Sequence, residues 1–204
     1  MLRAFIAIKL SDDLKRQIEG VQADLDRQVS RQGKSGRIGR IGKIGWVRPE
    51  GIHLTLKFLG EIPETQIEAV GAVVRRAASV ADPFALEARG LGAFPNPRAP
   101  RVLWLGLHGE PGAMDALQRL QAAVEAGVAG LGFPREDRAF TPHLTLARVR
   151  DRGAAEPLEQ VLAGGRDRVV GGFRAGALAL IKSELRPSGA VYTTLVEVPL
   201  GGGV

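Results

Sequence analysis

The sequence predicts an α+β protein in which two similar lobes face each other. Three observations support this fold class. The chain has 204 residues, 45% of them apolar, which is enough for a sizeable core. Strand-like and helix-like segments follow in the same order in both halves. The tetrapeptide HLTL occurs at residues 53–56 and again at 143–146, ninety residues later (143 − 53), a distance that suits one duplicated lobe.

The first half alternates strands and helices. RAFIAIKL predicts a strand, and the helix that follows has Ser11 as its cap and apolar residues such as Leu14, Ile18 and Leu25 at helical spacing. GIHLTLKFLG predicts the next strand. Pro63 opens a second helix, PETQIEAVGAVVRRAASVA, and FALEARGLGAF predicts a strand that ends at a PNP turn.

The second half repeats this order. RVLWLGL predicts a strand, His108 follows in a loop-like HGEPG context, and PGAMDALQRLQAAVEAGVAGLG predicts a helix. FTPHLTLARVR predicts a strand and AAEPLEQVLAG a short helix. FRAGALALIKSEL and AVYTTLVEVPL predict two final strands, joined by a turn at residues 187–189.

Residues 29–45, VSRQGKSGRIGRIGKIG, differ from the rest. They carry five basic side chains and no acidic one, and their glycine density disfavours a helix. We therefore expect a basic, glycine-rich loop between the first helix and the first HLTL strand. Two interpretations stay open: an arm that follows a phosphate backbone, or a solvated low-complexity insertion.

Charge and composition restrict the function. The formal charge of +6 and a pI of about 10.3 favour polyanionic partners, although a basic surface also simply keeps a protein in solution. The absence of cysteine excludes disulfides, thiolate metal sites and a cysteine nucleophile, and it fits a reducing cytoplasm. No apolar run is long enough to span a bilayer, and the N-terminus reads as a strand and not as a signal peptide. We expect a cytoplasmic protein that does not bind membranes.

The HLTL motifs place polar side chains on one face of each strand. Because successive side chains of a strand point to opposite faces, His53 and Thr55 share one face, and His143 and Thr145 do the same in the second motif. The leucines of both motifs point the other way, toward the helices. If the lobes face each other, the two imidazoles and two hydroxyls converge.

Two histidines of near-neutral pKa can work together, one as general base and one as general acid. Threonine hydroxyls can donate hydrogen bonds to anionic oxygens, so the four side chains suit in-line attack at a phosphodiester. A single His-x-Thr on a strand is usually structural, but two copies in matched lobes favour function. A metal site would need carboxylates or a third imidazole nearby, and neither motif contains an acidic residue. We therefore expect neither a metal nor a cofactor.

The two motifs resemble the His-x-Thr-x signatures of the two-histidine (2H) phosphoesterase superfamily. The resemblance extends to FIAIKL, WVRPEGIHLTLKFLGEIP, LGAFPNPRAPRVLWLGL, LGFPREDRAFTPHLTLARVR and SELRPSGAVYTTL, which together cover nearly the whole chain. These segments are similar to the prokaryotic RNA 2',3'-cyclic phosphodiesterases, formerly called 2'-5' RNA ligases. The basic glycine-rich segment is longer than this resemblance leads one to expect.

The resemblance implies a single bilobal domain over residues 1–204. In it, two pseudo-symmetric lobes each have an antiparallel sheet with helices packed outside, and the active groove lies between them. It implies metal-independent opening of a terminal 2',3'-cyclic phosphate to a 2'-phosphate, with His53 as proton donor, His143 as proton acceptor, and Thr55 and Thr145 as phosphate-binding hydroxyls. The implied partners are RNA ends with a 2',3'-cyclic phosphate, tRNA fragments among them, or small cyclic nucleotides. A monomer is expected.

Two further residues are candidates for substrate binding. Phe94 can stack on the terminal base or belong to the core at a strand end. Arg148 can meet a phosphate, but strict alternation places it on the face opposite His143, so a bulge or twist is needed to bring it round. Trp46 and Trp104 are expected in the core.

The alternatives to this hydrolase are an accessory module and a different enzyme. An RNA-binding or tRNA-processing module would keep the two-histidine groove only as a cleft. Another 2H phosphodiesterase would act on a different cyclic or 2'-5' linkage. In the reverse direction a 5'-hydroxyl would replace water and give 2'-5' ligation. Two titratable groups favour an enzyme, because binding alone needs none.

Overall fold

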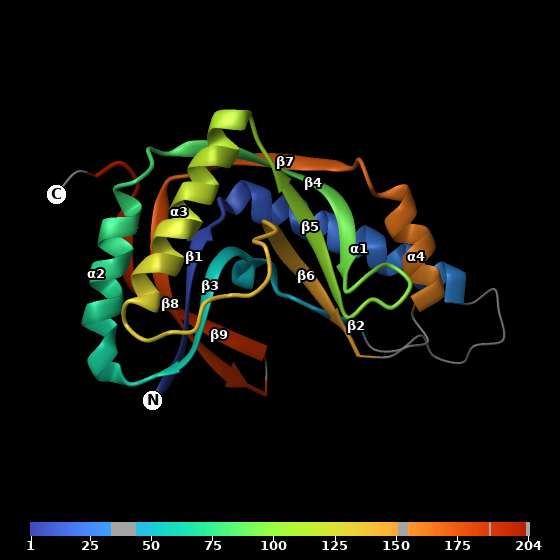
Figure 1. The fold of residues 1–204 in the computed structure, drawn as a ribbon. Helices are drawn as coiled ribbons and strands as arrows, with labels where there is room; N and C mark the ends of the chain where they lie inside the picture. Colours follow the sequence, from blue (N-terminus) through green and yellow to red (C-terminus); the bar gives the residue numbers. More distant parts are fainter. Residues whose placement is uncertain (34–43, 151–154, 188, 203–204) are drawn as a thin grey trace.

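The computed structural model describes residues 1–33, 44–150, 155–187 and 189–202 of the chain. These residues form nine strands, four α-helices and two short 3-10 helices, in agreement with the predicted α+β class (Figure 1). In chain order the elements are β1 (Leu2–Lys9), α1 (Asp12–Gly33), β2 (Ile44–Trp46), η1 (Pro49–Gly51), β3 (His53–Ile62), η2 (Glu64–Gln66), α2 (Ile67–Ala78), β4 (Phe84–Phe94), β5 (Val102–His108), α3 (Pro111–Ala129), β6 (His143–Val149), α4 (Ala155–Gly164), β7 (Val169–Ala175), β8 (Ala177–Arg186) and β9 (Gly189–Pro199).

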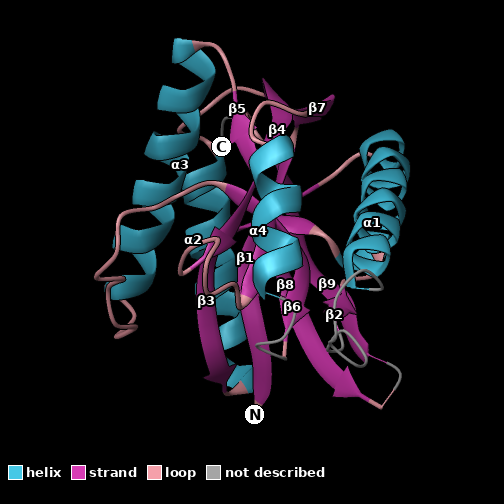
Figure 2. Ribbon diagram, turned by 90° about the vertical axis from the view of Figure 1, so that its right-hand side faces the viewer, coloured by secondary structure: helices cyan, strands magenta, loops and turns pink. Residues whose placement is uncertain are grey.

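The strands form one curled antiparallel sheet in the order β7-β4-β5-β6-β3-β1-β8-β9, and β2 pairs with β6. The first lobe contains β3, β1, β8 and β9, with α2 and α3 packed on it. The second lobe contains β6, β5, β4 and β7, with α1 and α4 (Figures 1 and 2). The two lobes meet between β3 and β6, where Leu54 pairs with Leu144. The two HLTL strands are therefore neighbours at the centre of the sheet.

The lobes are not the two halves of the chain. β8 and β9, from the C-terminal end, pair with β1, whereas β4, from the first half, pairs with β5 of the second half. The expectation of one lobe per half is corrected here. Each lobe therefore contains strands from both halves of the chain, which are joined by backbone hydrogen bonds and by the packing of the helices.

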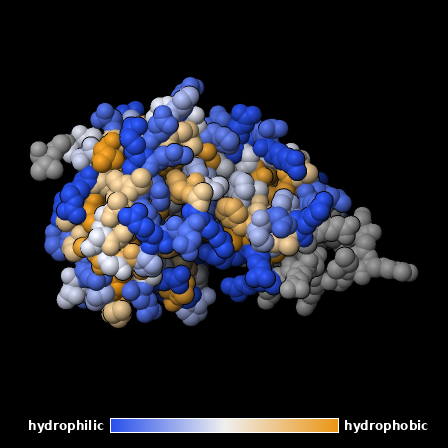
Figure 3. Space-filling model, viewed as in Figure 1, coloured by the Kyte–Doolittle hydropathy of each residue, from blue (hydrophilic) through white to orange (hydrophobic). Residues whose placement is uncertain are grey.

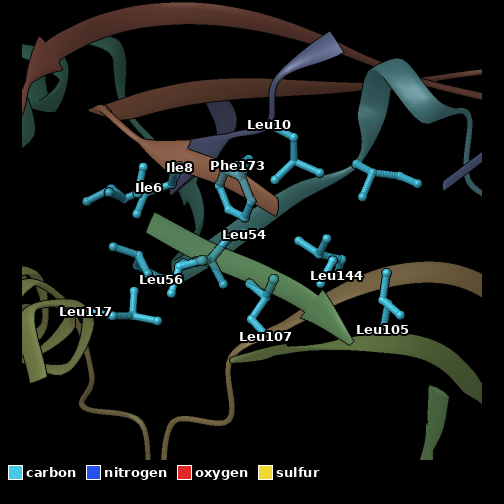
Figure 4. Packing of buried hydrophobic residues seen from close by; sticks show 14 of the residues in the cluster. Ile6, Ile8, Leu10, Leu54, Leu56, Leu105, Leu107, Leu117, Leu144 and Phe173 are labelled. Carbon is cyan, nitrogen blue, oxygen red and sulfur yellow. The ribbon is translucent and has the colours of Figure 1, made fainter. Parts of the chain in front are cut away.

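The core lies between the sheet and the helices. Leu54, Leu144 and Leu146 are completely buried in it, and Leu56 is nearly so. Figure 4 shows Leu54, Leu56 and Leu144 in one cluster with Leu117 of α3 and Phe173 of β7. The leucines of both motifs therefore pack under the helices, as the alternation predicts, and their burial is the main stabilising contribution at this point.

The first helix begins as predicted and ends later than expected. The Ser11 hydroxyl accepts a hydrogen bond from the Leu14 N–H at 3.3 Å, which is the predicted cap. Val29 is buried and continues the apolar spacing of the helix, so α1 extends to Gly33. At the other end of the predicted loop 29–45, Ile44 and Gly45 belong to β2. The loop prediction is wrong at both ends, and its central part, residues 34–43, lies outside the described residues.

Two other boundaries also differ. The strand predicted over residues 173–185 is two strands, β7 and β8, which separate at Gly176 and pair in different lobes. Periodicity alone does not reveal the break, because both pieces are apolar and extended. His108 is the last residue of β5 and does not begin a loop.

The surface shown in Figure 3 is largely hydrophilic, with hydrophobic residues interspersed. None of the helices in the described part of the chain is long and apolar enough to cross a membrane.

Candidate active site

The four motif side chains share the sheet face opposite the buried leucines; we call it the motif face. The register pairs Leu54 with Leu144, whose numbers add to 198. His53 and Thr55 flank Leu54 in β3, and His143 and Thr145 flank Leu144 in β6. Because side chains alternate along a strand, all four point to the face opposite these leucines, on either side of the Leu54–Leu144 pair.

His53 sits among aromatic rings of the first lobe. Its imidazole stacks on the Phe5 ring, with centroids 4.4 Å apart, and meets the Tyr192 ring edge-on at 5.3 Å. Gly51 makes room for this arrangement, because a side chain there would collide with the Tyr192 ring. Burial lowers the pKa of His53 from its usual value to about 4, while a hydrogen bond with the backbone of Gly51 acts in the opposite direction.

His143 has a matching aromatic environment in the second lobe. Its ring meets Phe94 edge-on at 5.0 Å and lies 6.5 Å from Trp104. Phe94 and Trp104 also contact each other, at 5.3 Å. A side chain at Gly92 would overlap the Trp104 indole, so this glycine lets the indole lie across β4.

Both histidines bond to a backbone group two residues earlier. The Nδ1 of His143 lies 2.7 Å from the carbonyl oxygen of Thr141, and His53 bonds to the backbone of Gly51. The bond to a carbonyl keeps a proton on Nδ1 of His143, so in the neutral ring Nε2 carries the free lone pair. That is the tautomer a general base needs.

A β-bulge follows the second motif and reorients Arg148. Along β5, Trp104 pairs with Thr145 but Leu103 pairs with Ala147, so Leu146 is an extra residue in β6. The extra residue shifts the alternation by one position. Arg148 then pairs with Val102, on the same face as Trp104 and Thr145, and its side chain is exposed. The bulge that Arg148 requires is therefore present, and this residue joins the motif face.

The first motif has a bulge at the equivalent position. Thr55 pairs with Ala7 but Lys57 pairs with Ile6, so Leu56 is the extra residue. The same shift brings Phe58 to the motif face, where it is 61% exposed and lies 6.0 Å from the Phe5 ring. Phe58 and Arg148 thus hold equivalent places, five residues after each histidine. The motif face is aromatic at one of these places and cationic at the other.

Behind the first motif lies a buried ion pair. The Lys57 ammonium is 2.7 Å from the Glu125 carboxylate of α3 and also donates to the carbonyl oxygen of Pro134. The same carboxylate accepts a hydrogen bond from the backbone N–H of Glu136. These contacts connect the first motif strand to the segment that leads into the second motif.

Several residues of the motif face were not predicted from the sequence. Phe5, Phe58 and Tyr192 come from distant segments, and no local pattern singles them out. Trp104 was expected in the core but is only half-buried and points to the motif face, 6.5 Å from His143; that expectation is corrected. Trp46 is half-buried against the core, and its indole N–H donates to Asp26 at 2.9 Å.

Phe94 is half-buried at the end of β4, in contact with the second histidine. Among the described residues, no group of three or more His, Cys, Asp or Glu side chains is placed to hold a metal ion. The described motif face includes imidazoles, hydroxyls, the Arg148 guanidinium and aromatic rings.

The family model of the 2'-5' RNA ligase superfamily matches residues 37–186, which include both motifs. The RNA 2',3'-cyclic phosphodiesterase of Methanothermobacter thermautotrophicus is 32% identical over 194 residues, 95% of this chain and 96% of that protein. The protein of the same name from Thermus thermophilus is 40% identical over 158 residues, 76% of this chain and 75% of its own.

Solved structures agree with the fold. The crystal structure of TT0787 of Thermus thermophilus matches with a TM-score of 0.69 at 32% identity, covering 98% of this chain and 99% of that one. E. coli LigT complexed with 3'-AMP matches with a TM-score of 0.71 at 25% identity, again covering 98% and 99%. The likeness extends over both lobes.

Proposed function

This chain belongs to the 2'-5' RNA ligase superfamily, and we propose that it is a hydrolase that opens RNA 2',3'-cyclic phosphate termini to 2'-phosphomonoesters without a metal ion. The observation that carries the proposal is the pairing of Leu54 with Leu144. It makes the two motif strands neighbours, and this supports a shared site of two imidazoles and two hydroxyls, the set that acid–base attack at a phosphodiester uses. The names of the relatives support the RNA substrate.

In the proposed reaction the two histidines have separate roles. Nε2 of His143 takes a proton from water as the water oxygen bonds to phosphorus. The bond from phosphorus to the 3'-oxygen breaks, and His53 gives its proton to that oxygen. The products are a 2'-phosphate and a free 3'-hydroxyl. The bond from His143 Nδ1 to the Thr141 carbonyl supports the assignment of His143 as the base.

The low pKa of His53 places a condition on its role as the acid. With a pKa of about 4, the imidazole is neutral in the free protein at neutral pH. An anionic phosphodiester bound beside it favours the protonated form and raises the pKa. Binding of the anionic substrate therefore helps to protonate His53, the residue that later gives its proton to the substrate.

The other polar groups hold the phosphate in this scheme. Thr55 and Thr145 donate hydrogen bonds to the non-bridging oxygens, and Arg148 adds a positive charge from the end of the second motif. Phe94 stacks on the terminal base. Its place beside His143 supports this role, because a ring there is within reach of a nucleoside attached to the reacting phosphate.

The same site supports the reverse reaction. A 5'-hydroxyl that takes the place of water gives its proton to His143 and bonds to phosphorus, while the bond to the 3'-oxygen breaks and His53 protonates that oxygen; the product is a 2'-5' linkage. We propose a monomer that acts in the cytoplasm on RNA ends, tRNA fragments among them, or on small cyclic nucleotides. The absence of cysteine supports this compartment.

A turnover assay tests the proposal. Adenosine 2',3'-cyclic monophosphate is incubated with the protein in the presence of EDTA, and the products are separated by chromatography. We expect hydrolysis at an undiminished rate. Activity that is lost in EDTA and restored by zinc or manganese would rule out the metal-free mechanism. Absence of turnover, with RNA still bound, would identify a binding module.

A further inference from the structure

The bulge in β6 places Arg148 on the motif face, and the structure shows what holds this bulge. At Leu146 the ladder to β5 is interrupted, and the Leu146 carbonyl faces β2, where Val47 follows the pairing of Trp46 with Ala147. It accepts two hydrogen bonds. The backbone N–H of Val47 donates to it at 2.9 Å, and the side-chain amide of Gln22 donates to it at 2.9 Å.

Gln22 lies in the middle of α1 and is only 7% exposed. Its Nε2 also donates to the carbonyl oxygen of Val47, at 2.8 Å. Both hydrogens of the amide are therefore used, one on each side of the contact between β6 and the segment that follows β2. A buried glutamine in an otherwise apolar helix face is costly unless it is bonded in this way.

The bulge of the first motif is held by different contacts. After Leu56 the chain continues with Lys57, whose own side chain is fixed by Glu125 and by the Pro134 carbonyl. At the equivalent place after Leu146 the second motif has Ala147, which is fully buried and carries no polar group. The second bulge therefore depends on a side chain brought from α1.

We propose that Gln22 is a positioning residue of the second motif: it fixes the bulge at Leu146 and thereby sets the place of Arg148 on the motif face. Gln22 does not touch the reacting atoms. It acts through the Leu146 carbonyl, two residues before Arg148 in the chain. The inference rests on the proposed function only where turnover is the readout, because phosphate binding by Arg148 can be followed without it.

The test uses Gln22→Met, which keeps the size of the side chain and removes both donors. Gln28→Met is the matched control: Gln28 lies on the same helix, and its amide bonds to Asp24 at 3.3 Å, away from the motif strands. We expect Gln22→Met to lower kcat/KM about ten- to hundredfold, the cost of displacing a positioned group by about 1 Å. Gln28→Met should stay within about twofold of the unmodified protein, as expected for a change remote from the site.

A double-variant cycle separates positioning from a general loss of stability. In a chain that already carries Arg148→Ala, Gln22→Met should cost less than about threefold, because the group it positions is gone. Equal fold-losses in both backgrounds, or a folded Gln22→Met with unchanged kcat/KM, would overturn the proposal. If Gln22→Met does not fold, Gln22→Asn, which is too short to reach both carbonyls, takes its place.

A second readout is independent of turnover. Titration with inorganic phosphate, followed by the NMR signal of the Arg148 guanidinium Hε, should show weaker binding in Gln22→Met than in Gln28→Met. If the unmodified protein shows no turnover but this difference is present, the proposed function fails and the role of Gln22 stands. If turnover is present and Gln22→Met binds phosphate as the control does, the role of Gln22 fails alone.

Discussion

At the scale of single residues, the environment of His53 joins catalysis to stability. Its ring is held between Phe5 and Tyr192, and burial among them disfavours the charged imidazolium. The same aromatic neighbours that lower the pKa also fix the orientation of the ring.

Each motif histidine should be required for the chemical step. We expect His53→Ala or His143→Ala to lower kcat by roughly two to four orders of magnitude, the usual worth of a positioned acid or base. Thr55→Ala or Thr145→Ala should cost about one to three orders, by analogy with loss of one oxyanion donor. Single-turnover kinetics on a cyclic mononucleotide measure these losses. A folded histidine variant with near-normal turnover contradicts the assignment.

His53 should also make stability depend on pH. Its pKa is about 4 in the folded protein and close to 6.5 when unfolded, so the unfolded chain binds the proton more tightly. The contribution of His53 to the free energy of unfolding is fully present above pH 6.5 and is lost as the pH drops toward 4. Below pH 4 this contribution does not change further. The loss amounts to at most about 3 kcal/mol, and less because the ring is partly solvated.

The measurement compares denaturant unfolding of the unmodified protein with that of His53→Gln between pH 7 and pH 4. Carboxylates titrate in both proteins, so the difference between the two curves isolates His53. We expect the free energy of unfolding to fall more steeply with decreasing pH in the unmodified protein. Parallel curves would show that His53 is solvated and that its pKa is ordinary.

Phe58 should contribute to binding and not to the chemical step. It is a large exposed aromatic side chain on the motif face, placed there by the bulge at Leu56. Phe58→Ala should raise KM for an oligonucleotide about five- to hundredfold, since base–aromatic stacking is worth about 1–3 kcal/mol per base, and leave kcat nearly unchanged. Val80→Ala, another exposed apolar residue, is the control. Equal KM values for Phe58→Ala and Val80→Ala would assign Phe58 no role in binding.

At the scale of elements, the two bulges, and the hydrogen bonds and ion pair that hold them, decide which side chains reach the motif face. The side chains of Lys57 and Glu125 are only 5% and 14% exposed, so each buried charge is destabilising unless it is paired with the other. We expect Lys57→Met to lower the free energy of unfolding by about 3–5 kcal/mol, because it leaves the Glu125 carboxylate buried without its partner. Lys57→Met combined with Glu125→Leu should recover much of this loss. Chemical denaturation of both variants measures the effect; a double variant less stable than the single one would contradict it.

Element prediction from the sequence works where local physical signals are strong. The strand over residues 84–94 matches β4, and the apolar spacing and Ser11 cap locate the start of α1. It fails where tertiary pairing decides. Nothing local separates β7 from β8 at Gly176, and the bulge at Leu146, which brings Arg148 to the motif face, is visible only in the register with β5. Gln22, 124 residues from its acceptor, could not be found from the sequence for the same reason.

At the scale of the whole molecule, the repeat of one tetrapeptide gives two histidines in related but unequal surroundings. His53 lies in an aromatic environment of the first lobe, and His143 lies in that of the second, next to the bulge with Arg148. In-line displacement needs the base and the acid on opposite sides of phosphorus. A pseudo-symmetric pair of lobes meets this need, and the inequality of the two environments supports the proposal that one histidine acts as acid and the other as base.

The dependence of rate on pH should show this inequality. The reaction needs one protonated and one neutral imidazole, so kcat/KM should be bell-shaped, with apparent pKa values that belong to the pair. In such a bell the lower of the two pKa values sets the acidic limb, whichever role that group has; because the pKa of His53 is about 4, the acidic limb of kcat/KM should fall near pH 4 and not near 6.5. Bound anionic substrate raises this pKa, so the acidic limb of kcat should lie at higher pH than that of kcat/KM. Coincident limbs near pH 6.5 would show that burial does not perturb His53.

The product isomer tests the orientation in which the nucleoside binds between the two lobes. If His53 protonates the 3'-oxygen, the product is a 2'-phosphate, which phosphorus NMR distinguishes from a 3'-phosphate. A 3'-nucleotidase that leaves the product intact provides the control. The two lobes are alike enough that a nucleoside could in principle bind in either sense, and the asymmetry of Phe58 and Arg148 favours one of them. A predominant 3'-phosphate would mean that the nucleoside lies the other way round, and the donor and acceptor roles of the histidines would lose their basis even if both proved essential.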